Sequence, residues 1–159
     1  MLSLPPLFEE DVQSMESAMD ELLRQTEATA ALLIDKGGPL ICERGDTEAF
    51  DTTTMAALAA GSFAATEAIA GLIGEANFNS VYQQGDRRSL LVTNVGLNAL
   101  MIVVFQGDKS VGAVRYFSAV ANKQISRQLS IAHGRNPDAV LDLVSMDLAN
   151  TAVLFKKKA

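Results

Sequence analysis

The 159-residue chain is poor in cysteine, histidine and proline, with one, one and four of each. The single cysteine, Cys42, excludes an internal disulfide and fits a reducing compartment. The single histidine, His133, leaves a histidine-based metal site or a catalytic triad only one residue to build on. With 48 % apolar and 20 % charged residues, the composition is too apolar for a disordered protein and too mixed for a membrane protein.

Clusters of basic residues are also scarce, and the formal net charge is -6. Nucleic-acid binding draws its affinity from clustered Lys and Arg, so we expect no nucleic-acid partner. The basic run 156–158 resembles a solubilising tail. The start of the chain carries Pro5 and Pro6 and no positive charge, unlike a signal peptide, and no uninterrupted apolar run approaches ~20 residues. We therefore expect a cytoplasmic protein without membrane insertion.

Apolar periodicity and turn residues predict eight elements in the order α-β-β-α-β-β-β-α. The expected helices are 8–26, 55–73 and 110–133, and the expected strands are 29–35, 40–43, 78–84, 89–95 and 99–105. The two most continuously apolar strands, 29–35 and 99–105, should be covered on both faces. This order predicts an α/β (α+β) domain over 8–132 with a five-stranded, mainly antiparallel sheet flanked by helices. The remainder, 133–159, is expected to be an extension with some helical character.

The helix expected at 55–73 is apolar on more than one side. On a helical wheel its large residues Met55, Leu58, Ile69, Leu72 and Ile73 share one side, which we expect to pack on the sheet. The opposite side carries Glu67 as its one charge and otherwise consists of small residues. They are Ala57, Ala60, Gly61, Ala64, Ala68 and Gly71.

An exposed alanine-rich face kept for helix propensity is the simpler interpretation of these small residues. Two glycines oppose it, because each weakens a helix by about 1 kcal/mol. Small residues spaced four and three apart also let another backbone approach closely. We therefore interpret the small-residue side as a contact surface.

The residues offer little chemistry. Cys42 is interpreted as a small core residue and His133 as a residue at a helix end, and the acids of the first helix, Asp11 among them, as its solvated face. The segment 107–110 lacks the pattern of a phosphate loop, and 122–125 lacks the aspartate of a guanine-reading motif. Arg87 and Arg88 follow a turn. They are interpreted either as solvated residues at a hairpin tip or as a trans-acting arginine finger. We predict no catalytic residue, cofactor or metal.

Four segments together resemble the roadblock/dynein light chain family, and within it the bacterial MglB-type partners of the polarity GTPase MglA. They are LLIDKGGPLI (32–41), DTTTMAALAAGSFAA (51–65), LIGEANF (72–78) and YQQGDRRSLLVTNVG (82–96). The resemblance extends from about Phe8 to Leu129, and no family motif matches the chain after His133.

The resemblance implies a homodimer in which two sheets join and the two second helices lie side by side as a platform for the GTPase. It further implies that the protein stimulates GTP hydrolysis, in cell polarity or motility, without supplying a catalytic residue. The six small residues Ala57 to Gly71 would then form the dimer and GTPase platform. One alternative is a roadblock scaffold that binds a GTPase or signalling complex without altering hydrolysis. A third is a small-molecule sensor or enzyme on a profilin-like sheet.

Overall fold

The computed structural model describes residues 4–135, and its eight elements follow the predicted order. They are α1 (Glu9–Thr26), β1 (Ala30–Asp35), β2 (Leu40–Gly45), α2 (Thr52–Leu72), β3 (Ser80–Gln83), β4 (Arg88–Val95), β5 (Ala99–Gln106) and α3 (Val111–His133). The predicted extension lies, from residue 136 onward, outside the described residues.

The five strands form one antiparallel sheet in the order β2-β1-β5-β4-β3. β1 and β5 lie inside this sheet, with Leu32 of β1 opposite Ile102 of β5. All residues from Ala30 to Ile34 are fully buried, as is nearly all of β5. Both faces of each strand are covered, which explains why the two strands are continuously apolar in sequence.

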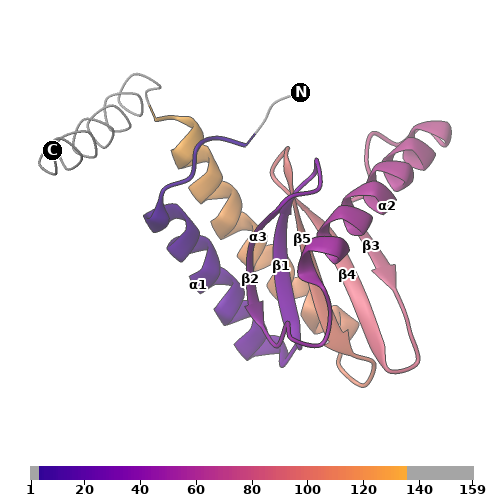
Figure 1. Ribbon diagram of the computed structural model, residues 1–159. Helices are drawn as coiled ribbons and strands as arrows, with labels where there is room; N and C mark the ends of the chain where they lie inside the picture. The colour runs from indigo at the N-terminus through magenta and orange to yellow at the C-terminus, as the bar shows by residue number, and fades with distance from the viewer. Residues whose placement is uncertain (1–3, 136–159) are drawn as a thin grey trace, which may run out of the picture.

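The helices cover the sheet unequally (Figure 1). α1 and α3 lie together on one face, where they bury alternate strand residues such as Leu33, Met101 and Phe105. Of the described helices, only α2 lies on the other face, where it packs on the intervening residues, among them Leu32 and Ile102. The period of two along each strand therefore divides the core into two layers.

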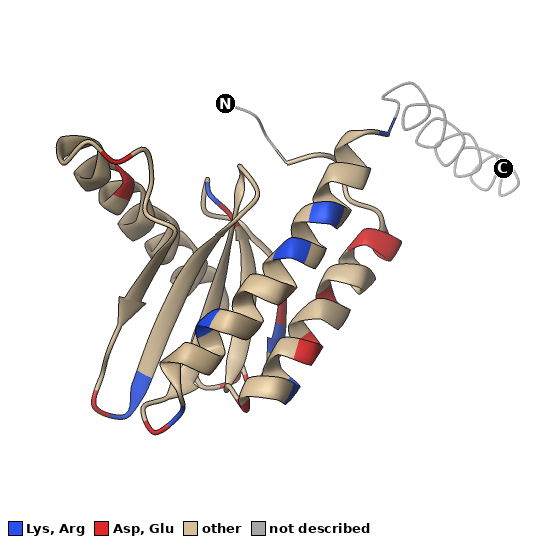
Figure 2. Cartoon of the chain, turned by 180° about the vertical axis from the view of Figure 1, so that it is seen from behind, with Lys and Arg blue, Asp and Glu red and all other residues tan. Residues whose placement is uncertain are grey.

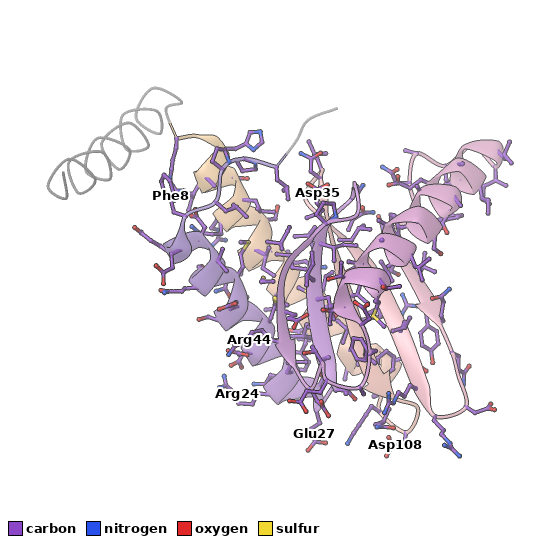
Figure 3. The ribbon with its side chains drawn as sticks, viewed as in Figure 1. Phe8, Arg24, Glu27, Asp35, Arg44 and Asp108 are labelled. Atoms are coloured by element: carbon purple, nitrogen blue, oxygen red, sulfur yellow. The ribbon has the colours of Figure 1, made fainter. Side chains whose placement is uncertain are left out.

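α1 is attached to strand β2 by polar contacts as well as by its apolar side. Arg44 donates from Nε to Oδ1 of Asp20 at 2.8 Å and from Nη2 to Oδ2 at 2.9 Å, and Figure 3 shows its side chain on the α1 side of the sheet. The next residue, Gly45, has φ +91°, and a Cβ there would lie 2.5 Å from the carbonyl oxygen of Thr29. Only glycine fits where β2 ends against the start of β1.

Helix α2 starts at Thr52, three residues before the predicted start, and α3 starts directly after Ser110, where the third helix was expected. The Asp51 carboxylate accepts hydrogen bonds from the backbone N–H of Thr54 at 3.1 Å and from its hydroxyl at 2.9 Å. Ser110 accepts one from the backbone N–H of Ala113 at 3.2 Å. Each cap satisfies a backbone donor that the first turn of a helix leaves unpaired.

Candidate interaction surface on helix α2

The side of α2 that packs on the sheet consists of small residues and one aromatic ring. Ala56, Ala60, Phe63 and Ala70 are its buried residues. The alanines bring the helix close to the strands, and Phe63 fills the remaining space. Ala60 therefore belongs to the sheet side, and the prediction that it forms part of an outward contact surface is wrong.

Four large apolar residues in or next to α2 are exposed instead of packed on the sheet. Leu58 is 69 % exposed and Leu72 86 %, and Ile69 and Ile73 are exposed as well. The prediction that these four pack on the sheet is wrong; of the five residues on that predicted side, only Met55 is half-buried. A helix that is apolar all round has no periodic pattern that marks its buried side. The helical wheel could therefore not show which side faces the sheet.

We call the exposed apolar residues of this helix the outer face of α2. They are Ala57, Leu58, Gly61, Ala64, Ala65, Ala68, Ile69, Gly71 and Leu72. Five of the six predicted platform residues are among them. The sequence analysis missed the three large members, Leu58, Ile69 and Leu72, although the lack of any charge besides Glu67 was a signal that the helix has two apolar sides.

Glu67, the one charged residue of α2, does not lie on this outer face. Its carboxylate pairs with Nζ of Lys36 at 3.0 Å, and both side chains are about three-quarters covered. The Lys36 ammonium also lies 5.8 Å from the centre of the Phe63 ring. The pair joins α2 to the turn between β1 and β2, so the prediction that Glu67 belongs to the small-residue side is wrong, and the outer face carries no charge.

The two glycines in α2 serve no contact inside this chain. A Cβ added at Gly61 or Gly71 would meet nothing within 4 Å. Glycine in a helix interior is destabilising by roughly 1 kcal/mol relative to alanine. Within this chain the two glycines weaken the helix without allowing any close contact. They do leave room for the backbone of another chain to approach the helix.

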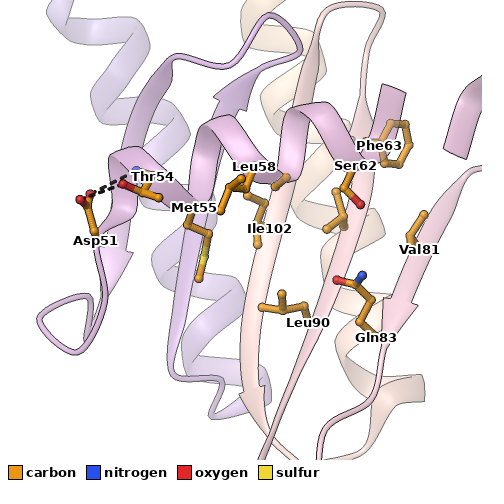
Figure 4. A pocket seen from close by; sticks show the side chains of 12 residues that line it. Asp51, Thr54, Met55, Leu58, Ser62, Phe63, Val81, Gln83, Leu90 and Ile102 are labelled. Atoms are coloured by element: carbon orange, nitrogen blue, oxygen red, sulfur yellow. Dashed lines mark hydrogen bonds between the residues drawn. The ribbon is translucent and has the colours of Figure 1, made fainter. Parts of the chain in front are cut away.

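An apolar groove of about 430 Å³ runs between α2 and the strands β3, β4 and β5 (Figure 4). The helix contributes Met55, Leu58 and Ser62 to it, and the strands contribute mainly Val81, Leu90, Val92 and Ile102. It exists because α2 packs on the β1 and β2 side of the sheet and leaves the β3 and β4 side uncovered. Figure 1 shows the last turns of α2 extending past the sheet.

The groove borders an open edge of the sheet. β3 pairs with β4 from Ser80 opposite Thr93 to Gln83 opposite Leu90, and within residues 4–135 no strand lies on its other side. An edge strand presents unpaired backbone N–H and C=O groups that another strand can meet. The outer face of α2, the groove and this edge thus form one continuous, largely apolar area.

By length and composition alone, α2 is apolar enough to cross a membrane, the one such helix in the described part of the chain. The sequence analysis considered only uninterrupted apolar runs, whereas α2 meets this criterion with glycine, serine and threonine among its apolar residues. In this structure the helix packs on the sheet and pairs its charge with Lys36.

The residues that the sequence analysis considered for chemistry, Cys42, His133, Arg87 and Arg88, do not line the apolar groove. Cys42 is buried with its Sγ 3.6 Å from Sδ of Met19, and burial raises the pKa of its thiol to about 12. His133 is exposed at the end of α3, while Arg87 and Arg88 are exposed where the β3–β4 turn enters β4. Among residues 4–135 no three metal-binding side chains cluster.

Comparison with known proteins finds a consistent set of relatives. The model of the Roadblock/LC7 domain matches residues 15–105. MglB of Myxococcus xanthus is 31 % identical with a TM-score of 0.77, over 83 % of this chain and 98 % of that one. Gliding protein MglB of Thermus thermophilus is 32 % identical with a TM-score of 0.73, over 82 % and 98 %.

A Roadblock/LC7 domain from Streptomyces avermitilis, 21 % identical, has the same fold with a TM-score of 0.65 over 72 % of this chain and 96 % of that one. No curated protein sequence matches.

Proposed function

Because this chain belongs to the Roadblock/LC7 domain family, we propose that it is a homodimeric regulator of a small Ras-like GTPase of the MglA kind. In this proposal it stimulates GTP hydrolysis without supplying a catalytic residue, acts in the cytoplasm, and serves cell polarity or motility. Its similarity to MglB proteins of Myxococcus xanthus and Thermus thermophilus, the latter described as a gliding protein, supports this role.

The outer face of α2 is the observation that carries the proposal. Its large residues Leu58, Ile69 and Leu72 remain exposed in a chain that buries most other large apolar side chains. A contiguous apolar patch of this kind is typical of a protein-interaction surface. A second copy placed against it would cover the large residues, and its backbone would approach most closely at Gly61 and Gly71.

The open edge at β3 supports the same arrangement. Two β3 strands related by a two-fold axis would join two sheets into one, and the two helices would then meet over the adjoining grooves. The combined surface of two α2 helices is broad and without charge. It would recognise a GTPase by shape and apolar contact, which fits a protein that repositions groups the GTPase already carries.

A single-turnover GTP hydrolysis assay tests the proposal. The cognate MglA-like GTPase is loaded with GTP and mixed with an excess of this protein, and phosphate release is followed. We expect the rate to rise well above the intrinsic rate of the GTPase. Binding without any change in rate would contradict the stimulating role and would support the alternative, a scaffold that holds the GTPase.

A further inference from the structure

A second groove, polar instead of apolar, lies on the face of the sheet opposite to α2. It has a volume of about 550 Å³ and runs between α3 and the neighbouring ends of β3 and β4. α3 contributes Arg115, Asn122, Lys123 and Arg127 to its lining, and the strands contribute Ser80 and Thr93 among others.

The cations of this groove have no acidic partner in the part of the chain that the structure describes. α3 contains Arg115, Lys123 and Arg127 and no Asp or Glu, as the blue and tan helix in Figure 2 shows. Within residues 4–135 none of the three forms an ion pair, whereas five other Lys and Arg residues do. Although the net charge is -6, the described part of the chain thus keeps three cations without an ion pair along one groove.

Hydrogen bonds hold the two walls of the groove at a fixed separation. Arg115 donates from Nη1 to the Ser80 hydroxyl at 2.8 Å, and its guanidinium lies 6.0 Å from the centre of the Tyr82 ring. Farther along α3, Asn122 donates from Nδ2 to the Thr93 hydroxyl at 2.7 Å. These contacts join α3 to both strands, and Arg115 keeps most of its five donors for a ligand.

The spacing of the cations indicates an extended ligand. Lys123 and Arg127 are eight and twelve residues beyond Arg115, which places them roughly 12 and 18 Å along the helix axis from it. A single small anion cannot meet charges spread over that length. An extended peptide covers it with about six residues, at about 3.3 Å per residue.

We propose that this groove binds an acidic, extended segment of a partner protein, with carboxylates meeting Arg115, Lys123 and Arg127. Bases of a single-stranded nucleic acid bind by stacking on aromatic rings, and the groove lining contains none. This site goes beyond the proposed function, because α3 and α2 cover opposite faces of the sheet.

Fluorescence anisotropy with a labelled octaglutamate peptide and the full-length protein tests the site. We expect saturable binding that weakens between about 50 and about 200 mM salt, since the paired charges are exposed, and no binding of labelled octaglutamine. The double variant Lys123→Gln/Arg127→Gln should weaken binding by about tenfold or more. The conservative double variant Lys123→Arg/Arg127→Lys should retain it.

Arg87→Gln/Arg88→Gln is the matched control, because it removes two exposed cations that form no ion pair in the described structure. They lie at the turn between β3 and β4, at the opposite ends of these strands from the groove. This control variant should change the affinity by less than about twofold. Equal losses in both double variants, or no binding by the wild type, overturn the proposal. So do displacement of the peptide by equimolar inorganic phosphate, and tighter binding of labelled oligothymidylate. A change of oligomeric mass in the groove variant would instead assign the site to a second copy of the chain, and would overturn it too.

Discussion

Arg135 donates two hydrogen bonds to Asp11, from Nη1 to Oδ2 at 2.5 Å and from Nη2 to Oδ1 at 2.6 Å. The Asp11 carboxylate also accepts from Nε2 of Gln128 at 2.6 Å and from the backbone N–H of Phe8 at 2.8 Å. Asp11 is fully buried, so these bonds compensate a charge that water cannot reach. They join the start of α1 to the end of α3.

We predict that Asp11→Asn lowers the free energy of unfolding by about 3 kcal/mol, because it removes one member of a buried ion pair. Urea denaturation measures the loss. Glu10→Gln is the control, since Glu10 is an exposed acid in the same turn of α1; it should change the value by no more than about 0.5 kcal/mol. Equal effects of the two substitutions would contradict a special role for Asp11.

The lowered pKa of Asp11 predicts that the stability of the fold depends on pH. Hydrogen bonds from Arg135 are the largest cause that lowers the pKa of Asp11, from 3.8 to about 2, and burial opposes them. A carboxyl group whose pKa is lowered by folding stabilises the protein at pH values above its pKa in the unfolded chain. This stabilisation is lost as the pH falls through the pKa of the group in the folded protein. The wild-type free energy of unfolding should therefore drop between about pH 4 and pH 2 more steeply than that of Asp11→Asn. Parallel curves would count against this assignment.

Dimer formation is tested at two isoleucines of equal exposure. Ile69 on α2 is 54 % exposed and Ile131 on α3 is 53 % exposed. We predict that Ile69→Glu gives a monomer in light scattering at micromolar concentration, because the buried charge would have no partner in the interface. Ile131→Glu should remain a dimer like the wild type. A monomeric wild type at every concentration refutes the dimer.

Nucleotide dependence separates an activator from a scaffold. A protein that biases a switch must bind its two states unequally. We expect the GTP form of the GTPase to bind at least about tenfold more tightly than the GDP form, which corresponds to about 1.4 kcal/mol. Titration of each form by fluorescence anisotropy gives the ratio, and equal affinities would favour the scaffold.

Elements with a clear period were predictable from the sequence. The strands are continuously apolar where both of their faces are buried, and Ser110 caps α3 at its predicted start, whereas α2 starts three residues before the predicted one. The interior position of β1 in the sheet could also be inferred, because Ala30 to Ile34 carry no polar residue to face water.

Features that depend on a distant partner could not be predicted. Asp11 stands among exposed acids in the sequence, and only the return of α3 brings Arg135 and Gln128 against it. Glu67 likewise finds Lys36, 31 residues away. The prediction of which side of α2 packs on the sheet was wrong, because large residues usually mark the core side of a helix. Here Ala56 and Ala60 face the sheet and Leu72 is exposed.

Single-turnover GTP hydrolysis with variant proteins tests most directly the claim that α2 acts by shape and without a catalytic residue. Ala68→Arg should abolish stimulation, because a long charged side chain cannot be buried where a methyl group fits. Gln124→Arg places the same side chain at an exposed position of α3 and should leave stimulation unchanged. Arg87→Ala and Arg88→Ala should lower stimulation only mildly, whereas loss of an arginine finger lowers it roughly a thousandfold or more. A collapse of stimulation in Arg88→Ala, with binding intact, would contradict the account.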